Sequence, residues 1–90
     1  MNSQVRRFLT NKLILDQKLH KDSSIWEMYY ELVRRTLFMK LGENEKKQIQ
    51  SELDAGEIEK FEKLCEEKLT DKDYVIINNY IHLKVSKLFN

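Results

Sequence analysis

Proline is absent from the chain, and glycine occurs only twice, as Gly42 and Gly56. These two residue types supply most of the tight turns between β-strands, so a chain almost without them is poorly suited to an all-β fold. Charged residues make up 34% of the sequence. Most of them are Lys and Glu, which favour helix. We therefore expect an all-α protein.

The length of 90 residues suits one domain, and we expect a single helical domain over residues 1–90. The one cysteine, Cys65, cannot support a disulfide framework. The opening residues, MNSQVRRFLTNK, lack the apolar stretch of a secretory signal, and the chain has no apolar run of about 18 residues. These features predict a cytoplasmic protein.

Apolar residues recur at helical spacing from Ser3 to Leu19, which predicts a first helix. Ser24 stands three residues before Glu27, the spacing of a capping box, and predicts a second helix over Ile25–Leu41. We expect Gly42 to supply the left-handed residue that follows the end of this helix.

Residues 43–54 predict a short polar helix whose large apolar residues are Ile49 and Leu53. A break is expected from Asp54 to Gly56, where Asp54 and Glu57 have the spacing of a second capping box. The helix after the break has an apolar face that consists of Ile58, Phe61, Leu64, Cys65 and Leu69.

Thr70 and Asp73 have the spacing of a third capping box, and we expect a last helix from Tyr74 to about Phe89. Its predicted apolar face consists of Tyr74, Ile77, Ile81, Val85 and Leu88, widened by Ile76, Tyr80 and Leu83. The β-branched and aromatic content of residues 74–85 would also suit strand, but the cap and the lack of a glycine turn favour helix. The complete pattern predicts a bundle of four to five helices with Ile25–Leu41 as the central helix.

The sequence offers little for catalysis or metal binding. His20, His82 and Cys65 are scattered, without the spacing of a zinc site. Cys65 lies on the apolar side of an acidic helix, where burial and negative charge disfavour a thiolate. Two isolated glycines cannot form a phosphate-binding loop. We expect no enzyme, no cofactor and no metal.

The segment Ile25–Leu41 is apolar over more than half of its circumference. Trp26, Tyr30, Val33, Leu37 and Leu41 form one stripe, and Ile25, Met28, Tyr29, Leu32, Thr36 and Met39 form a second beside it. Both stripes could be covered in a central helix, or one could bind a partner, since Trp, Tyr and Met are enriched at interfaces. We expect an adaptor, inhibitor or regulator that binds another protein and is itself a homodimer. The predicted partner-binding residues are Trp26, Tyr29, Tyr30, Val33 and Leu37.

The alternative is a nucleic-acid-binding accessory protein that uses the basic N-terminal half. Residues 1–42 have eight basic and four acidic side chains, a net charge of +4, whereas residues 43–69 have a net charge of −4. The candidate phosphate contacts are Arg6, Arg7, Arg34, Arg35 and Lys40. Against this alternative, Glu31 has the spacing to pair with Arg34 and Arg35, and the sequence pI is only about 7.8.

The stretch IQSELDAGEIEKFEKL, Ile49 to Leu64, resembles the short IDEAL domain of Gram-positive bacteria in its isoleucine, its Leu-Asp pair and its later Phe and Leu. The resemblance covers under a fifth of the chain, and Gln50 stands where that domain has an acidic residue. It implies no function for this chain.

Overall fold

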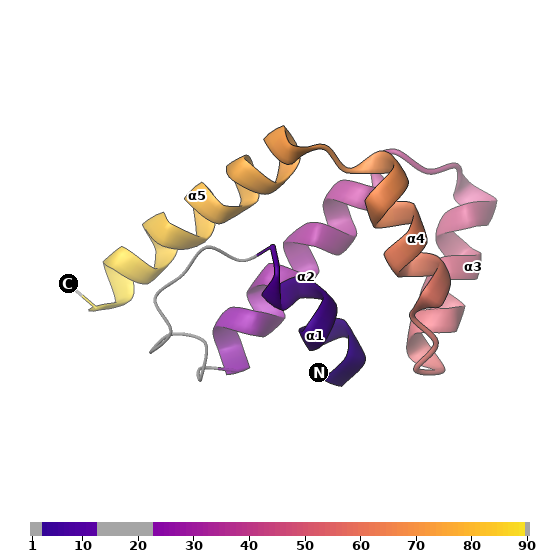
Figure 1. The fold of residues 1–90 in the computed structure, drawn as a ribbon, viewed down its shortest axis with the longest axis horizontal. Coiled ribbons are helices and arrows are strands. Elements are labelled where there is room, and N and C mark those ends of the chain that lie inside the picture. Colours follow the sequence, from indigo (N-terminus) through magenta and orange to yellow (C-terminus); the bar gives the residue numbers. More distant parts are fainter. Residues whose placement is uncertain (1–2, 13–22, 90) are drawn as a thin grey trace.

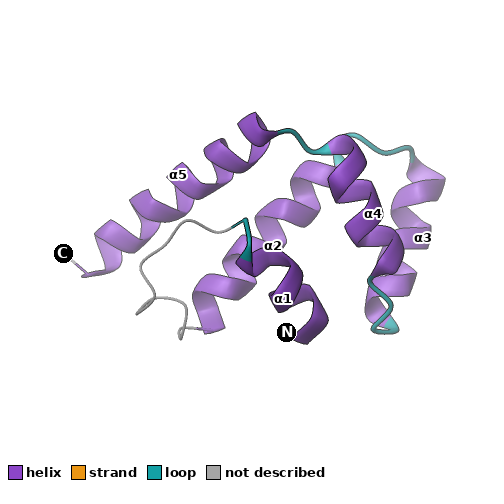
Figure 2. Ribbon diagram, in the orientation of Figure 1, coloured by secondary structure: helices purple, strands orange, loops and turns teal. Residues whose placement is uncertain are grey.

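The computed structural model describes residues 3–12 and 23–89, and within these ranges the chain forms five helices and no strand (Figures 1 and 2). The helices are α1 (Ser3–Thr10), α2 (Ser23–Phe38), α3 (Glu43–Asp54), α4 (Glu59–Lys68) and α5 (Asp71–Phe89). The predicted all-α fold is therefore confirmed. Residues 74–85, for which strand was the alternative, lie inside α5.

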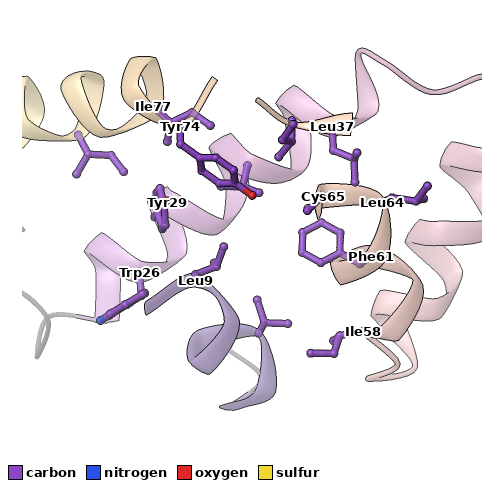
Figure 3. Close-up of a cluster of buried hydrophobic side chains, with 14 of the residues drawn as sticks. Leu9, Trp26, Tyr29, Leu37, Ile58, Phe61, Leu64, Cys65, Tyr74 and Ile77 are labelled. Atoms are coloured by element: carbon purple, nitrogen blue, oxygen red, sulfur yellow. The ribbon is translucent and has the colours of Figure 1, made fainter. Parts of the chain in front are cut away.

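α2 is the central helix, as the sequence predicts. It contacts α1, α4 and α5, while α3 packs against α4 (Figure 1). One cluster of buried apolar side chains includes residues from all five helices, and Figure 3 shows part of it. Because α2 faces three neighbours, it can bury apolar side chains over a wide arc of its surface.

The predicted inner face of α4 is also confirmed, and so is the predicted face of α5 without the three residues that were expected to widen it. The buried side chains of this part of the core include Ile58, Phe61, Leu64, Cys65, Leu69, Tyr74, Ile77, Ile81 and Val85. The side chain of Leu88, which completes the predicted set, lies outside the described residues. α3 buries Ile49 and half-buries Leu53, so it is the polar, lightly attached helix that its sequence predicts.

The left-handed glycine between two helices is Gly56 and not Gly42. Gly56 has φ 81°, and it follows α3 in a Schellman motif: the Glu57 amide donates to the Glu52 carbonyl at 2.8 Å, and the Gly56 amide donates to the Leu53 carbonyl at 3.0 Å. Gly42 has φ −75° and ψ 165° and lies at the N-cap of α3. The prediction that Gly42 is the left-handed residue is wrong, because α2 ends at Phe38 and the four residues 39–42 connect it to α3.

The predicted capping boxes differ in outcome. Thr70 and Asp73 form theirs: the Thr70 amide donates to Asp73 Oδ2 at 2.8 Å, and the Asp73 amide donates to Thr70 Oγ1 at 3.2 Å. The box predicted at Asp54 is wrong, because the Schellman turn occupies that position and Ile58 is the N-cap of α4. α2 begins at Ser23, which places Ser24 in its first turn and not at its cap.

The first helix is shorter than its periodicity predicts. α1 ends at Thr10, and the Lys12 amide donates to the Leu9 carbonyl at 2.9 Å in the turn that follows. A continuous helix through residues 11 and 12 is therefore wrong, and residues 13–19 and His20 lie outside the described residues. Val5 and Leu9 are the residues by which α1 joins the core.

None of the described helices is long and apolar enough to cross a membrane.

Candidate interaction surface

The structure does not expose the surface that the sequence predicts on α2. Trp26, Tyr29, Val33 and Leu37 are buried in the core, and Figure 3 shows the first two and Leu37 among the core side chains. Tyr30 is half-buried, with its ring 5.9 Å from the ring of Phe61 in an edge-to-face arrangement. The four buried residues hold α2 against its neighbours and present no surface to a partner in this fold, and Tyr30 presents only part of its side chain.

The second stripe of α2 is covered as well. Ile25 and Tyr29 are buried, and Met28 and Leu32 are half-buried against the same core. Met39 is 79% exposed, but it lies beyond the last residue of α2. The fold therefore covers both apolar stripes of its central helix.

The exposed apolar residues are concentrated on α5. Five large apolar side chains of the described residues are exposed, and four of them lie within nine residues of α5. Their exposed fractions are 51% for Val75, 58% for Ile76, 44% for Tyr80 and 65% for Leu83. Ile76, Tyr80 and Leu83 lie on one side of the helix, which we call the outer face of α5, and Val75 lies about 100° around the helix from Ile76, at the edge of that face. The prediction that Ile76, Tyr80 and Leu83 widen the buried face is wrong, because they lie on the opposite side of the helix.

The helical repeat explains this arrangement. With about 100° per residue, Ile76 is about 180° from Val85 and about 140° from Ile81, which are both buried. Tyr80 and Leu83 follow Ile76 at steps of four and three residues and share its side of the helix. This signal is present in the sequence. The sequence prediction missed it because it places Ile76, Tyr80 and Leu83 on the same wide face as Ile77 and Ile81.

Charged and polar residues border the outer face. The Lys84 ammonium lies 5.4 Å from the centroid of the Tyr80 ring, at cation–π distance. Asp71 and Lys72 are exposed in the first turn of α5, and Lys87 is exposed near its last turn. An apolar patch with a polar border is typical of a protein-binding surface.

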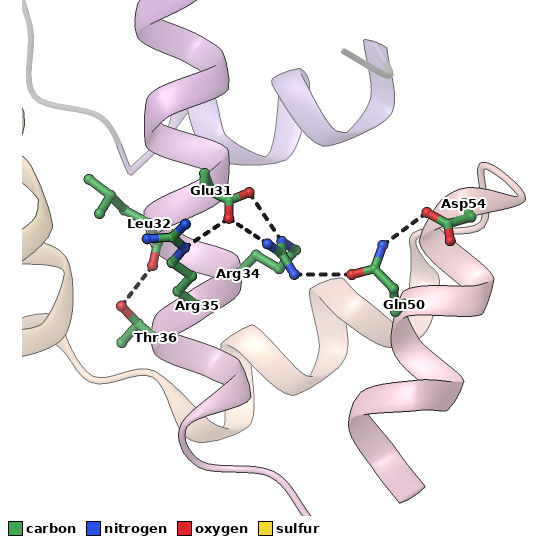
Figure 4. Close-up of polar contacts among 7 residues, drawn as sticks. All are labelled: Glu31, Leu32, Arg34, Arg35, Thr36, Gln50 and Asp54. Atoms are coloured by element: carbon green, nitrogen blue, oxygen red, sulfur yellow. Dashed lines mark hydrogen bonds and ion pairs between the residues drawn. The ribbon is translucent and has the colours of Figure 1, made fainter. Parts of the chain in front are cut away.

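The candidate phosphate contacts are largely engaged within the protein. Glu31 accepts from Arg35 Nε at 2.9 Å and also pairs with Arg34, whose Nη1 donates to Gln50 Oε1 at 3.0 Å (Figure 4). The Arg34 hydrogen bond is the main cause that lowers the pKa of Glu31. Gln50 in turn donates to Asp54 at 2.9 Å, so this network joins α2 to α3.

The other three basic candidates lie in two different places. Lys40 donates to Asp73 Oδ2 at 2.6 Å and to the Lys68 carbonyl at 2.9 Å, which ties the end of α2 to α4 and α5. The Arg6 guanidinium lies 5.2 Å from the centroid of the Trp26 ring. Arg7 is exposed on α1. Three of the five candidates are thus in ion pairs, which lowers the positive charge they can offer to phosphates.

A hollow of about 510 Å³ lies between the start of α1 and the turn from α3 to α4. Its lining residues are Gln4, Glu52, Gly56, Glu57, Ile58, Glu59 and Lys60. These residues place three carboxylates beside one lysine and include no histidine, cysteine or serine. Within the described ranges, no three His, Cys, Asp or Glu side chains lie close enough together to hold a metal ion.

The polar side chain of Asn78 is buried where α2, α4 and α5 meet. Asn78 Nδ2 donates to the Tyr74 carbonyl at 2.8 Å and to the Lys12 carbonyl at 3.0 Å. Burial raises the pKa of Tyr29 well above its usual range, and the neighbouring Asn78 offsets only part of that increase. Burial, with help from Glu66 and Glu62, raises the pKa of the Cys65 thiol to about 12. A thiol held neutral in this way is a core residue and not a nucleophile.

Comparisons of the chain with protein-family models, with curated proteins and with solved structures find no match. The short resemblance to the IDEAL domain therefore gains no support from a family model.

Proposed function

We propose that this chain is a small non-enzymatic protein-interaction module of the cytoplasm, an adaptor, inhibitor or regulator that binds another protein through the outer face of α5. The observation that carries the proposal is the exposure of Ile76, Tyr80 and Leu83 on one side of α5, with exposed Val75 at the edge of that side. Exposed apolar area opposes solubility and favours aggregation unless a partner covers it. The single cysteine is the feature that favours a reducing compartment.

The composition of the outer face also supports protein binding. It places an aromatic ring between aliphatic side chains and has a lysine beside the ring. Aromatic residues are enriched among the residues that dominate binding energy at protein interfaces. A single amphipathic helix that binds through residues at three- and four-residue steps is a common recognition element. α5 has that spacing on a side that α2 does not cover.

The proposal can be tested with a photo-crosslinking amino acid placed at Leu83. The matched control is the same amino acid at Lys63, an exposed position of α4. We expect a protein adduct in living cells from position 83 and none from position 63. The captured protein is then purified, and its affinity for wild type is compared with its affinity for Leu83→Glu, which we expect to be at least tenfold weaker. Equal adducts from both positions, or none from either, would contradict the proposal.

Nucleic-acid binding through Arg6, Arg7, Arg34, Arg35 and Lys40 remains the alternative hypothesis. It predicts retention on heparin or duplex DNA that weakens steeply with salt. It also predicts that Arg34→Glu/Arg35→Glu abolishes the retention. Observation of both effects would replace the proposal above, whereas elution at low salt would support it against this alternative.

A further inference from the structure

We infer that the outer face of α5 binds an acidic amphipathic helix of a different protein, in which carboxylates flank an apolar stretch at both ends. The inference rests on the proposed function, because it gives the chemistry of the partner for the surface proposed there. It is argued from two exposed lysines that lie in line with the apolar residues of this face, and from the charges around them.

The two lysines extend the outer face beyond its apolar residues. At steps of four, four, three and four residues, five exposed side chains follow one line along α5: Lys72, Ile76, Tyr80, Leu83 and Lys87. With about 100° per residue, all of them lie within about 40° of Ile76 around the helix. The lysines are about 22 Å apart along the axis, and the apolar part between them spans about 10 Å. This line, which we call the lysine-ended stripe, has an apolar centre and one cation at each end.

The carboxylates of α5 do not neutralise the lysine-ended stripe. Asp71 and Asp73 are the only acidic residues of this helix. Asp73 accepts from Lys40 at 2.6 Å, so an ion pair within the protein already uses its charge. Asp71 lies about 140° around the helix from Ile76, away from the stripe. Within residues 3–12 and 23–89, Lys72 and Lys87 are in none of the ion pairs. Carboxylates of a partner would therefore meet two unpaired ammonium groups.

The same two charges argue against a second copy of this chain as the partner. If two copies of α5 pair antiparallel through their apolar centres, Lys72 of each lies beside Lys87 of the other. If they pair parallel, each lysine lies beside its own counterpart. Both orientations place like charges together, so the expected homodimer gains no support from this surface. A helix with Asp or Glu at both ends of an apolar stretch complements the stripe in either direction.

The position of the lysines also favours a helix over a lipid surface or a nucleic acid. The lysines of a helix that lies on a bilayer occupy its polar face, whereas Lys72 and Lys87 share the line of the apolar residues. A nucleic acid carries closely spaced phosphates along its whole length and would meet apolar side chains in the middle of the stripe. A helix laid along α5 has room, because α5 runs along one outer edge of the molecule with α2 on its inner side (Figure 1).

Selection from a library of helical peptides tests the inference. Each peptide is about 20 residues long, so that it can form a helix, and its randomised positions repeat the spacing of the lysine-ended stripe. With wild type as bait, we expect Asp or Glu at the two end positions and apolar residues at the positions between them. With Lys72→Glu/Lys87→Glu as bait, we expect Lys or Arg at the end positions, because the charge of the stripe is reversed.

The matched control is Lys47→Glu/Lys63→Glu, which makes the same change of charge at exposed lysines of α3 and α4. We expect this control to select the same peptides as wild type. Fluorescence anisotropy with the peptide most enriched on wild type should show binding weaker by roughly tenfold or more for Lys72→Glu/Lys87→Glu, and unchanged binding for the control. Lys72→Ala/Lys87→Ala, which should also weaken binding, replaces the charge-reversed variant if thermal unfolding shows that the latter is not folded.

Several results would overturn the inference. Two are selection of no peptide, and selection of apolar peptides without acidic ends. A third is salt-sensitive sedimentation of wild type with vesicles of phosphatidylcholine and phosphatidylserine that Lys72→Glu/Lys87→Glu abolishes, which would assign the surface to a membrane. A fourth is a wild-type dimer in sedimentation velocity that Leu83→Glu dissociates, which would assign it to a second copy. The proposed function would survive the first two results if the photo-crosslinker at position 83 captured a protein in cells. It would fail by itself if position 83 captured none.

Discussion

Gly56 and Gly42 have opposite backbone requirements, although each lies between two helices. Gly56 has φ 81°, a region that residues with a Cβ atom occupy at a cost. Gly42 has φ −75°, which any residue can adopt, and a Cβ atom added there would meet nothing within 4 Å. Only the first position therefore depends on glycine for its conformation.

We expect Gly56→Ala to destabilise the protein by about 1 kcal/mol, because alanine pays the cost of the left-handed conformation. Gly42→Ala should change the free energy of unfolding by less than about 0.5 kcal/mol: the loss of backbone freedom in the unfolded chain offsets the weaker N-cap. Urea unfolding of the two variants and wild type measures both effects. Equal destabilisation by the two substitutions would contradict the assignment of Gly56 to the Schellman turn.

At the scale of one element, α5 has two apolar faces that have different roles. Ile76 and Ile77 are neighbours in sequence, yet Ile76 is exposed and Ile77 is buried against the core. The helical repeat separates their side chains by about 100°, which is enough to place one in the core and the other in solvent. This adjacent pair gives a direct test of the orientation of the helix.

We expect Ile77→Ala to cost about 3 kcal/mol, through lost apolar burial and the cavity that remains. Ile76→Ala should change stability by less than about 0.5 kcal/mol. Both variants are measured by chemical unfolding at a concentration at which the chain is monomeric, so that any dimer contributes nothing. A large cost at position 76 and a small one at position 77 would show that α5 is rotated from the orientation described above.

The start of α5 is also the point where three helices are joined. Asp73 completes the capping box with Thr70 and accepts a hydrogen bond from Lys40, which also donates to the last residue of α4. The Lys40 hydrogen bond, followed by the Thr70 amide, lowers the pKa of Asp73. One carboxylate thus fixes the start of α5 relative to the ends of α2 and α4.

We expect Asp73→Ala to destabilise the protein by about 1–2 kcal/mol at neutral pH. Asp71→Ala is the matched control: it removes an exposed carboxylate from the same turn, and we expect a loss of about 0.3–0.5 kcal/mol. Because folding lowers the pKa of Asp73, the ionised carboxylate contributes to the free energy of unfolding at neutral pH. This contribution declines as the pH falls below about 4. The stability difference between wild type and Asp73→Ala should therefore shrink in acid, and a constant difference would contradict this assignment.

At the scale of the whole molecule, the place of a helix in the bundle decides how much of its apolar surface is covered. α2 packs against three helices and is hydrogen-bonded to α3, and both of its apolar stripes are buried or half-buried. α5 lies at the edge, and α2 is its main neighbour, so only one of its apolar faces is covered. The two helices are similar in sequence pattern and differ in their surroundings.

This difference sets the limit of what the sequence could predict. Periodicity identified the helices and the apolar face of α4, because a one-sided helix has only one way to bury its apolar residues. α2 and α5 are apolar on two sides, and their exposed side depends on which neighbours pack against them. For this reason Trp26 and Tyr29 were predicted as surface, whereas Ile76 and Leu83 were predicted as core. The prediction for Gly42 failed for a similar reason, because local spacing does not show that α2 ends at Phe38, about one turn before the predicted end at Leu41.

The core also contains three ionisable side chains that folding keeps protonated. Burial raises the pKa of Cys65 to about 12, and it raises the pKa values of Tyr29 and Tyr74 well above the usual value of a tyrosine. In the unfolded chain these groups release their protons at about pH 8.5 and 10. Above those values the unfolded state binds fewer protons than the folded state, so the free energy of unfolding must fall as the pH rises.

We expect stability to be constant from pH 7 to about 8.5, to decline above it, and to decline more steeply above about pH 10, where each buried phenol adds up to about 1.4 kcal/mol per pH unit. Tyr74→Phe should make the steep part shallower, because it removes one of the two buried phenols. Since the Tyr74 hydroxyl is buried without a hydrogen-bond partner, the substitution should cost little at pH 7. Urea unfolding across this pH range measures both curves. If wild type and Tyr74→Phe lost stability in parallel above pH 10, the result would contradict the burial of the Tyr74 phenol between α5 and α2.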